Sequence, residues 1–207
     1  MKTHRVRTSQ RASPPSCNGF TRRNTHPTTS RESRALARFP GEVVIKPCKE
    51  SGGIDVYRAP NRSVAELVAR FLSERYRILA VSPFEEILSE HRVVLLDGDA
   101  LLTYEKVRDS HDSTEWRHNL RFGAEPRLET SRRLCSELAD LGMAAIRAVG
   151  GAFMSVDIVA TSEGMRVMEI NSGVSLNHFA AVSAEHRALA VNVYRAAVQR
   201  CFSGDDA

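Results

Sequence analysis

The sequence predicts an α+β protein, and two observations lead to this prediction. Apolar runs joined by tight-turn residues indicate antiparallel hairpins at 92–107 and 153–171. Three longer segments are expected to be helices, at 63–76, 128–149 and 183–201, and the apolar residues of the first lie on one helix face. Because hairpins and helices are mixed in this way, we expect mixed or antiparallel sheets with packed helices.

Composition and charge limit the possible functions. Of 207 residues, 42% are hydrophobic, and no apolar run has the length of a membrane span. The four cysteines are widely spaced, which argues against a disulfide framework and predicts a reducing, cytoplasmic location. Residues 1–38 contain nine Lys or Arg and one acid, whereas the remainder contains 20 basic and 24 acidic residues. A nucleic-acid-binding face is therefore not expected in the body of the chain.

The chain divides by composition into three parts. Residues 1–33 are rich in Ser, Thr, Arg and Pro and have almost no aliphatic side chains, so we predict a disordered basic tail. Residues 34–82 and residues 83–207 each combine strands with helices. We predict that they form two subdomains.

The first predicted subdomain begins with a strand and a glycine loop. A strand at 42–46 ends at Pro47, and Gly52 and Gly53 belong to the loop that follows. A second strand is expected at 54–59.

A helix at 63–76 and a strand at 78–82 complete this subdomain. Ser63 and Glu66 have the spacing of a capping box, which predicts the start of the helix. The apolar side chains predicted to face the core are Val64, Leu67, Val68, Phe71 and Leu72.

The second predicted subdomain contains both hairpins and two helices. Asp97 and Gly98 provide the turn of the first hairpin. A polar loop at 109–126 leads to a helix at 128–149, and the last helix spans 183–201.

The hairpin at 153–171 carries three oxygen-bearing side chains. If Asp157 pairs with Glu169, then Asp157, Glu169 and Asn171 share one face, and a three-residue loop at 162–164 ends in glycine. Two carboxylates and an amide oxygen suit Mg²⁺ or Mn²⁺. A solvated hairpin face is the alternative interpretation.

Further polar residues are candidates for binding anions. Lys46 ends its strand beside the glycine loop, where it can pair with phosphate, although, taken alone, the pattern favours a surface ion pair beside an ordinary turn. Glu90 and Arg92 share a strand face and fit either a ribose and a phosphate or a cross-strand ion pair. Arg117 and Asn119 lie in the polar loop, where functional side chains concentrate.

Two other residues have weaker signals. Lys106 shares a face of the partner strand with Arg108 and would add positive charge there. His118, like the other histidines, lacks the spacing of a metal ligand and is interpreted as a surface or packing residue.

Taken in order, these segments resemble the later part of an ATP-grasp fold. The order is Lys46 before a glycine loop, AVSPF at 80–84, Glu90-His-Arg92, a hairpin, WRHNL at 116–120, a long helix, SVDI and MEINSG. It is similar to ribosomal-protein glutamate ligases, glutathione synthetases and D-alanine ligases over about residues 34–202. The family's N-terminal substrate domain and first ATP-contacting lysine are not matched, so the resemblance implies a fold that is incomplete at the N-terminus.

The resemblance implies roles for individual residues. Asp157, Glu169 and Asn171 would hold magnesium ions on the ATP phosphates, and Arg117 and Arg92 would steady the transferring phosphoryl group. The residues implied to contact the nucleotide are Lys46, Gly52 and Gly53 at the phosphates, Val81 and Phe84 at adenine, Glu90 at the ribose, and Asn119.

The implied function is an ATP- and Mg-dependent carboxylate–amine ligase that acts through an acylphosphate. Its substrates would be an amino acid or peptide, and a separate N-terminal substrate domain or subunit is an expected partner. Neither a specific nucleic acid nor a membrane is expected. The alternatives are a non-catalytic nucleotide-binding fragment or pseudo-enzyme subunit that needs a partner domain, and an ATP-grasp kinase of a small hydroxylated substrate.

Overall fold

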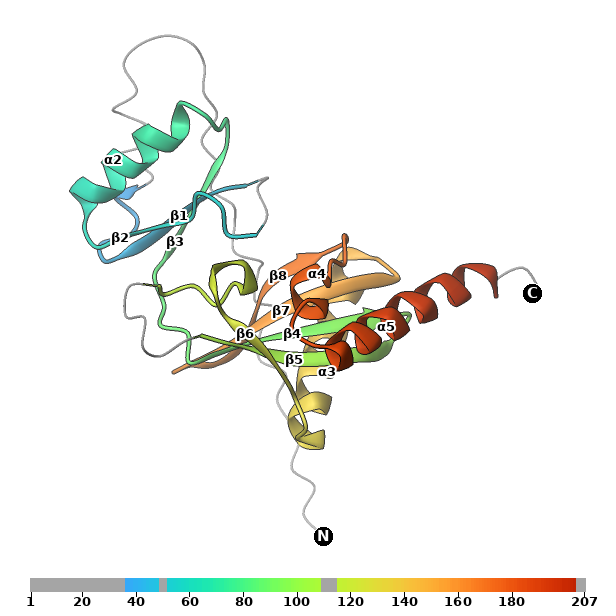
Figure 1. The fold of residues 1–207 in the computed structure, drawn as a ribbon. Coiled ribbons are helices and arrows are strands. Elements are labelled where there is room, and N and C mark those ends of the chain that lie inside the picture. The colour runs from blue at the N-terminus through green and yellow to red at the C-terminus, as the bar shows by residue number, and fades with distance from the viewer. Residues whose placement is uncertain (1–35, 49–51, 109–114, 204–207) are drawn as a thin grey trace. The chain divides into compact units, whose positions relative to one another are not determined.

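The computed structural model describes residues 36–48, 52–108 and 115–203, and the tail predicted to be disordered lies outside these ranges. The chain divides into two compact units, one ending at Phe84 and one starting at Glu85 (Figure 1). Each unit contains an antiparallel sheet, so the α+β prediction is confirmed. None of the helices described is long and apolar enough to cross a membrane.

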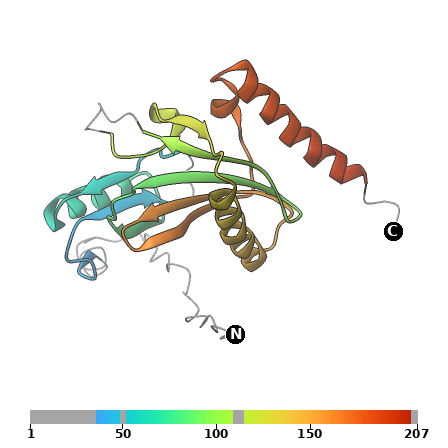
Figure 2. The same ribbon diagram turned by 90° about the horizontal axis from the view of Figure 1, so that it is seen from below.

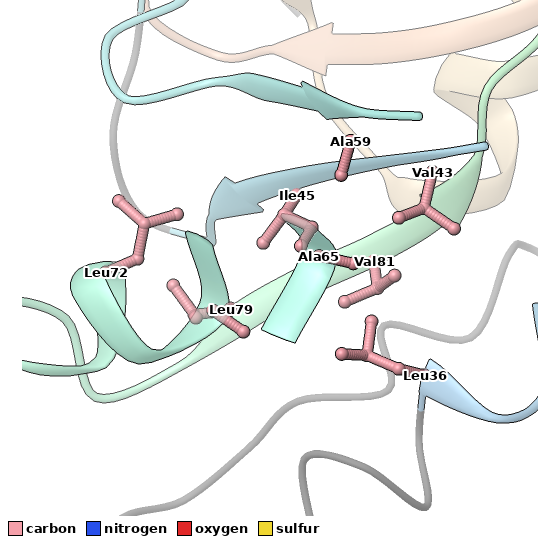
Figure 3. Packing of buried hydrophobic residues seen from close by; sticks show 9 residues of the cluster. Leu36, Val43, Ile45, Ala59, Ala65, Leu72, Leu79 and Val81 are labelled. Carbon is pink, nitrogen blue, oxygen red and sulfur yellow. The ribbon is translucent and has the colours of Figure 1, made fainter. Parts of the chain in front are cut away.

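The first unit is a three-stranded antiparallel sheet with one helix. Strand β1 (Val43–Pro47) lies between β2 (Tyr57–Ala59) and β3 (Leu79–Pro83), and α2 (Arg62–Ser73) packs on them. Because successive strand side chains alternate, Val43 and Ile45 enter the core and Lys46 lies on the opposite face. Figure 3 shows this core, whose labelled members are Leu36, Val43, Ile45, Ala59, Ala65, Leu72, Leu79 and Val81.

Helix α2 starts one residue earlier than predicted. Asn61 is the N-cap, and its side chain accepts a hydrogen bond from the Val64 amide at 3.0 Å. The predicted capping box is therefore wrong, because Ser63 already lies inside the helix, where it cannot cap the first turn.

The buried face of α2 also differs from the prediction. Ala65, Ala69 and Leu72 are buried, whereas Leu67 and Phe71 are 67% and 47% exposed. Alanine has no side chain beyond its Cβ, so a helix with two alanines against the sheet approaches it closely. The helix is thus rotated about its axis relative to the prediction, and only part of the predicted apolar face lies in the core.

The second unit is built on a five-stranded antiparallel sheet with the order β6-β5-β4-β7-β8. Its strands are β4 (Ser89–Leu96), β5 (Asp99–Val107), β6 (Glu125–Leu128), β7 (Phe153–Thr161) and β8 (Gly164–Asn171). Its helices are η1 (Leu120–Phe122), α3 (Arg132–Val149), α4 (Asn177–Ala180) and α5 (Ala184–Phe202). The short elements β6, η1 and α4 were not predicted.

The helix predicted at 128–149 starts later than expected. Ser131 is its N-cap and accepts a hydrogen bond from the Leu134 amide at 3.3 Å, while Leu128 belongs to β6. The hairpin of β4 and β5 is confirmed, because Asp97 and Gly98 form its turn with φ values of 47° and 105°. Both values are typical of the two-residue turns that join antiparallel strands.

Helices cover both faces of the five-stranded sheet. Helix α3 packs Leu138 and Ile146 on one face, against Val93 of β4 and its neighbours (Figure 2). On the other face, Phe179 of α4 packs with Tyr104 of β5. Arg92, Asp157 and Glu169, which are considered below, lie on this second face.

The hairpin of β7 and β8 has the predicted pairing at the site but a different loop. Asp157 lies opposite Glu169, as predicted, whereas Thr161 pairs with Gly164 and leaves a two-residue loop. The predicted three-residue loop is wrong because the register shifts by one between Asp157 and Ile158. The extra residue forms a bulge in β8, which absorbs the difference.

Candidate functional site

One row of side chains crosses all strands of the second unit's sheet. Arg92 of β4 lies between Tyr104 of β5 and Asp157 of β7, and Asp157 lies opposite Glu169 of β8. Leu128 of β6 ends the row opposite Tyr104. Because directly opposed residues point to the same side of a sheet, these side chains share one face.

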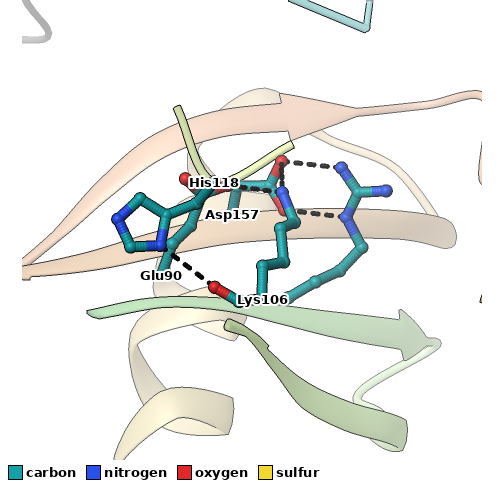
Figure 4. A network of polar contacts seen from close by, with 5 residues as sticks. Glu90, Lys106, His118 and Asp157 are labelled. Atoms are coloured by element: carbon teal, nitrogen blue, oxygen red, sulfur yellow. Dashed lines mark hydrogen bonds and ion pairs between the residues drawn. The ribbon is translucent and has the colours of Figure 1, made fainter. Parts of the chain in front are cut away.

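Asp157 is the centre of a buried ionic network (Figure 4). Arg92 donates to it twice, from Nε to Oδ1 and from Nη2 to Oδ2, each at 2.7 Å. Lys106 Nζ lies 3.0 Å from the same Oδ2 and also donates to the buried Glu90. Two cations thus face two carboxylates with little access of water.

The contacts between Arg92 and Asp157 favour the charged forms of both side chains. Burial alone would raise the pKa of Asp157, but hydrogen bonds from Arg92 and the charge of Lys106 lower this pKa below its ordinary value. Burial likewise opposes the charge of Arg92, and its bonds to Asp157 nevertheless raise the pKa of the guanidinium. A paired, charged carboxylate therefore occupies the middle of the row.

Tyr104 forms an apolar wall beside Arg92. It is fully buried, and burial raises the pKa of its hydroxyl to about 12. Its ring packs against Phe179 with 4.8 Å between centroids. Among the residues described, the hydroxyl has no hydrogen-bond partner. Tyr104 therefore remains a neutral phenol at physiological pH.

The structure brings the three predicted metal ligands to one sheet face. Asn171 follows Glu169 by two residues on β8 and lies opposite Ser155, which precedes Asp157 by two on β7. Glu169 is exposed and Asn171 is half-buried. Within the described ranges, Glu169 has no ion pair or side-chain hydrogen bond, whereas Asp157 is fully engaged.

The chemistry of these donors fits a hard divalent cation. All three side chains offer oxygen, which is the ligand atom that Mg²⁺ and Mn²⁺ prefer. In the described part of the chain, no group of three His, Cys, Asp or Glu has metal-binding geometry. The predicted set contains two carboxylates and one amide, so part of its coordination would come from water or phosphate.

The loop with Arg117 and Asn119 is attached to the edge of this network. His118 is buried, and its Nδ1 lies 3.0 Å from the backbone oxygen of Lys106. Arg117 donates to Glu115 from Nε and Nη2, at 2.8 and 2.7 Å. Asn119 is half-buried and precedes η1. His118 therefore fixes the loop beside Lys106, with Arg117 and Asn119 on either side of the anchor.

Lys46 and the glycine loop belong to the first unit. Lys46 is half-buried on the face of β1 away from the core, and it forms no ion pair with any residue in the described ranges. The surface ion pair considered as an alternative for Lys46 is therefore not seen there. Gly52 and Gly53 have φ values of 71° and 75°, in the left-handed region that favours glycine.

Val81 and Phe84 lie in and just after β3. The side chain of Val81 is buried in the core, so its backbone is the part available to a ligand. In the described part of the chain, β3 pairs with β1 only, which leaves its other edge with unpaired backbone groups. The Phe84 ring lies under Arg58, whose guanidinium carbon is 3.8 Å from the ring centroid.

Two of these residues, Lys106 and His118, make contacts in the site that their sequence pattern did not predict. Lys106 was expected only to add charge, and His118 only to pack. The approach of Lys106 to Glu90 could not be predicted from the turn at Asp97 and Gly98. A register shift between Val94 and Leu95 moves Lys106 from a position opposite Ser89 to one opposite Glu90. No sequence pattern indicated that His118 would contact the backbone of the same strand.

Comparisons with known proteins identify relatives for most of this chain. A family model for the prokaryotic glutathione synthetase ATP-grasp domain matches residues 19–178. Glutathione synthetase of Parasynechococcus marenigrum (strain WH8102) is 31% identical over 150 residues, covering 68% of this chain and 45% of the relative. Glutathione synthetase of Anaplasma centrale is 29% identical over 143 residues, covering 63% and 45% respectively. The chain spans about half the length of the curated relatives it matches.

Solved structures share the fold. D-alanine–D-alanine ligase of Bacillus anthracis superposes with a TM-score of 0.58 at 14% identity, covering 80% of this chain and 57% of the ligase. The same ligase in complex with ATP gives a TM-score of 0.57 at 17% identity, covering 87% and 59%. At these identities the likeness concerns the fold alone.

Proposed function

Because the chain belongs to the family of prokaryotic glutathione synthetase ATP-grasp domains, we propose that it is an ATP- and Mg-dependent ligase that joins a carboxylate to an amine. The observation that carries the proposal is the row of Arg92, Asp157 and Glu169 across one sheet face. This row lies inside the matched family region. It combines cations that can neutralise phosphate with oxygens that can hold a divalent ion.

The proposed reaction has two steps. The γ-phosphoryl group of ATP is transferred to an oxygen of the substrate carboxylate, which releases ADP and forms an acylphosphate. The amine nitrogen then attacks the acyl carbon, the C–O bond to phosphate breaks, and an amide and inorganic phosphate are formed. Both steps need positioning and charge neutralisation more than covalent participation of the protein.

The residues of the second unit supply these needs in the proposal. Asp157, Glu169 and Asn171 would hold Mg²⁺ or Mn²⁺, which supplies charge stabilisation at the phosphate oxygens. Arg92 and Arg117 would donate to the transferring phosphoryl group, since guanidinium groups match the geometry of phosphate.

The remaining assignments concern the nucleotide. Their support is chemical: a lysine with no ion pair among the described residues, glycines in the left-handed region, a strand edge that pairs with no other described strand, and a buried carboxylate. The residues assigned are Lys46, Gly52 and Gly53 at the phosphates, Val81 and Phe84 at adenine, Glu90 at the ribose, and Asn119.

A second candidate is a nucleotide-binding subunit that needs a partner domain for catalysis. The observation that favours it is coverage, because the matched part of each relative is 45% of its length. The binding site for the carboxylate and the amine would then lie on another polypeptide. A small peptide or amino acid is the substrate class proposed in both cases.

Release of ADP tests the proposal. The purified full chain is mixed with Mg-ATP, amino acids and small peptides, with and without the N-terminal half of a bacterial relative. We expect ADP and inorganic phosphate to accumulate beyond one equivalent per chain only when a carboxylate and an amine are both present, because the amine is needed to consume the acylphosphate. If Mg-ATP binds but no mixture yields ADP, the binding-subunit alternative is favoured; if Mg-ATP does not bind, both candidates fail.

A further inference from the structure

We infer that Lys106 and Arg92 remain paired with Asp157 until the phosphates of a nucleotide bind. A divalent cation then binds tightly to this sheet face only together with the nucleotide. The inference rests on the proposed function and adds an order of binding to it. It concerns what these two cations do before the metal is bound. Three observations support it.

The first observation is that the lone pairs of Asp157 are largely used. Three donor atoms contact its two oxygens, two from Arg92 at 2.7 Å and one from Lys106 at 3.0 Å. A carboxylate offers about four lone-pair sites. A metal ion that needs a direct bond to Asp157 must therefore displace at least part of this arrangement.

The second observation is that the two cations are shielded from water. The side chains of Lys106 and Arg92 are 3% and 19% exposed. A divalent ion lies about 2 Å from a carboxylate oxygen, and it would meet both positive groups where solvent screens their repulsion weakly. Binding of the metal alone is thus opposed by charge.

The third observation is that Lys106 and Arg92 can bind phosphate oxygens in place of Asp157. Lys106 carries its charge on a flexible four-carbon stem, and Arg92 presents donors that match phosphate as well as carboxylate. When phosphate oxygens accept these donors, the oxygens of Asp157 become available to a metal ion. The polyanion also offsets the charge of the incoming cation. Nucleotide and metal would therefore favour each other's binding.

The test measures binding of Mn²⁺ alone, from the loss of the electron paramagnetic resonance signal of the free ion. Wild-type protein is compared with Lys106→Met, which keeps an apolar stem and removes the charge. We expect the variant to bind Mn²⁺ about 5–150-fold more tightly than wild type in the absence of nucleotide, the range of typical coupling between sites.

Two further variants keep the result interpretable. Lys106→Met leaves Glu90 buried without its cation, so Lys106→Met/Glu90→Gln removes both charges and protects folding. The double variant should also bind Mn²⁺ alone more tightly than wild type. Arg127→Met is the matched control, because Arg127 forms an exposed ion pair with Glu105 of the same sheet. It should bind Mn²⁺ as wild type does.

The outcomes separate this inference from the proposed function. The melting temperature of wild-type protein should rise with Mn²⁺ and ATP together, and not with Mn²⁺ alone at the same concentration. If wild type binds Mn²⁺ alone as tightly as the folded double variant, the inference is overturned while the proposed function stands. If Mn²⁺ with ATP leaves the melting temperature unchanged, both are overturned.

Discussion

Asp157 connects three strands of the second unit through its side chain. It belongs to β7 and is bonded to Arg92 of β4 and Lys106 of β5. Each of these contacts lies in the buried part of the sheet face. Loss of this carboxylate would remove the partner of the half-buried Arg92 and one partner of the buried Lys106, so Asp157 should contribute to stability as well as to the proposed cation site.

Asp157→Asn should therefore reduce the free energy of unfolding at pH 7 by about 3–5 kcal/mol, the usual cost of breaking a buried ion pair. Urea denaturation followed by circular dichroism measures this difference. Asp140→Asn is the control, since Asp140 is exposed on α3. A loss below 1 kcal/mol for Asp157→Asn, similar to the control, would contradict the assignment of a buried ionic network.

The difference in stability between wild type and Asp157→Asn should also depend on pH. The pKa of Asp157 is lowered in the folded state from its ordinary value of 3.8, so protons bind more tightly to the unfolded chain. Its contribution is then fully present above pH 3.8 and is lost as the pH falls through the lower, folded-state pKa. The difference in stability between wild type and Asp157→Asn should be constant from pH 7 to 5 and shrink below pH 3.8. A difference that grew on acidification would have the wrong sign.

Glu169 differs from Asp157 because it is exposed and without a side-chain partner in the described residues. We expect Glu169→Gln to abolish binding of Mg-ATP while changing the free energy of unfolding by less than about 0.5 kcal/mol. Calorimetric titration with Mg-ATP and urea denaturation measure the two effects. Glu125→Gln removes an exposed carboxylate from β6 of the same sheet and should leave both unchanged. Normal Mg-ATP binding by Glu169→Gln would remove Glu169 from the proposed metal site.

At the scale of residues, strand alternation was a sufficient basis for predicting that Asp157, Glu169 and Asn171 share one sheet face. Once Asp157 was paired with Glu169, a common face for Asn171 followed from the two-residue period. Alternation could not show that Asp157 would contact both Arg92 and Lys106. Those contacts depend on which strands are neighbours, and β4 lies beside β7 although more than fifty residues separate them in sequence.

At the scale of elements, the start of α2 makes a prediction of its own. The Asn61 side chain caps the helix, and Ser63 lies in its first turn. Asn61→Ala should lower the free energy of unfolding of the first unit by about 1 kcal/mol, whereas Ser63→Ala should change it by less than about 0.5 kcal/mol. Thermal or urea denaturation of both variants checks this. The opposite order would restore the capping box predicted at Ser63.

Each feature that was not predicted from the sequence has its own physical reason. Strand β6 is four residues long and contains Pro126, which is tolerated in an edge strand but weakens the strand signal. The bulge in β8 has no residue signature, since any side chain can occupy it. In α2, two overlapping apolar stripes exist, and packing against the sheet selected the one with Ala65 and Ala69. Longer elements, such as α5 and the β4–β5 hairpin, were predictable.

At the scale of the molecule, the chain consists of two units with separate cores. The metal ligands proposed here belong to the second unit, and Lys46, Gly52 and Gly53 belong to the first. The family match extends over both units, from residue 19 to residue 178. We therefore expect nucleotide affinity to depend on residues of the first unit as well as on the proposed metal ligands.

Lys46→Ala tests this expectation. Lys46 forms no ion pair within the described ranges, so its loss should leave the stability of the protein nearly unchanged. A charge-assisted hydrogen bond to phosphate contributes about 1.5–3 kcal/mol, so Mg-ATP binding should weaken by roughly 10- to 150-fold. Calorimetric titration measures this, with Arg70→Ala as a control that removes an exposed cation from α2 of the same unit. Because Lys46 is proposed to contact phosphate and not adenosine, affinity for adenosine alone should be equal in Lys46→Ala and wild type. If Lys46→Ala binds Mg-ATP as the control does, Lys46 has no role in nucleotide binding.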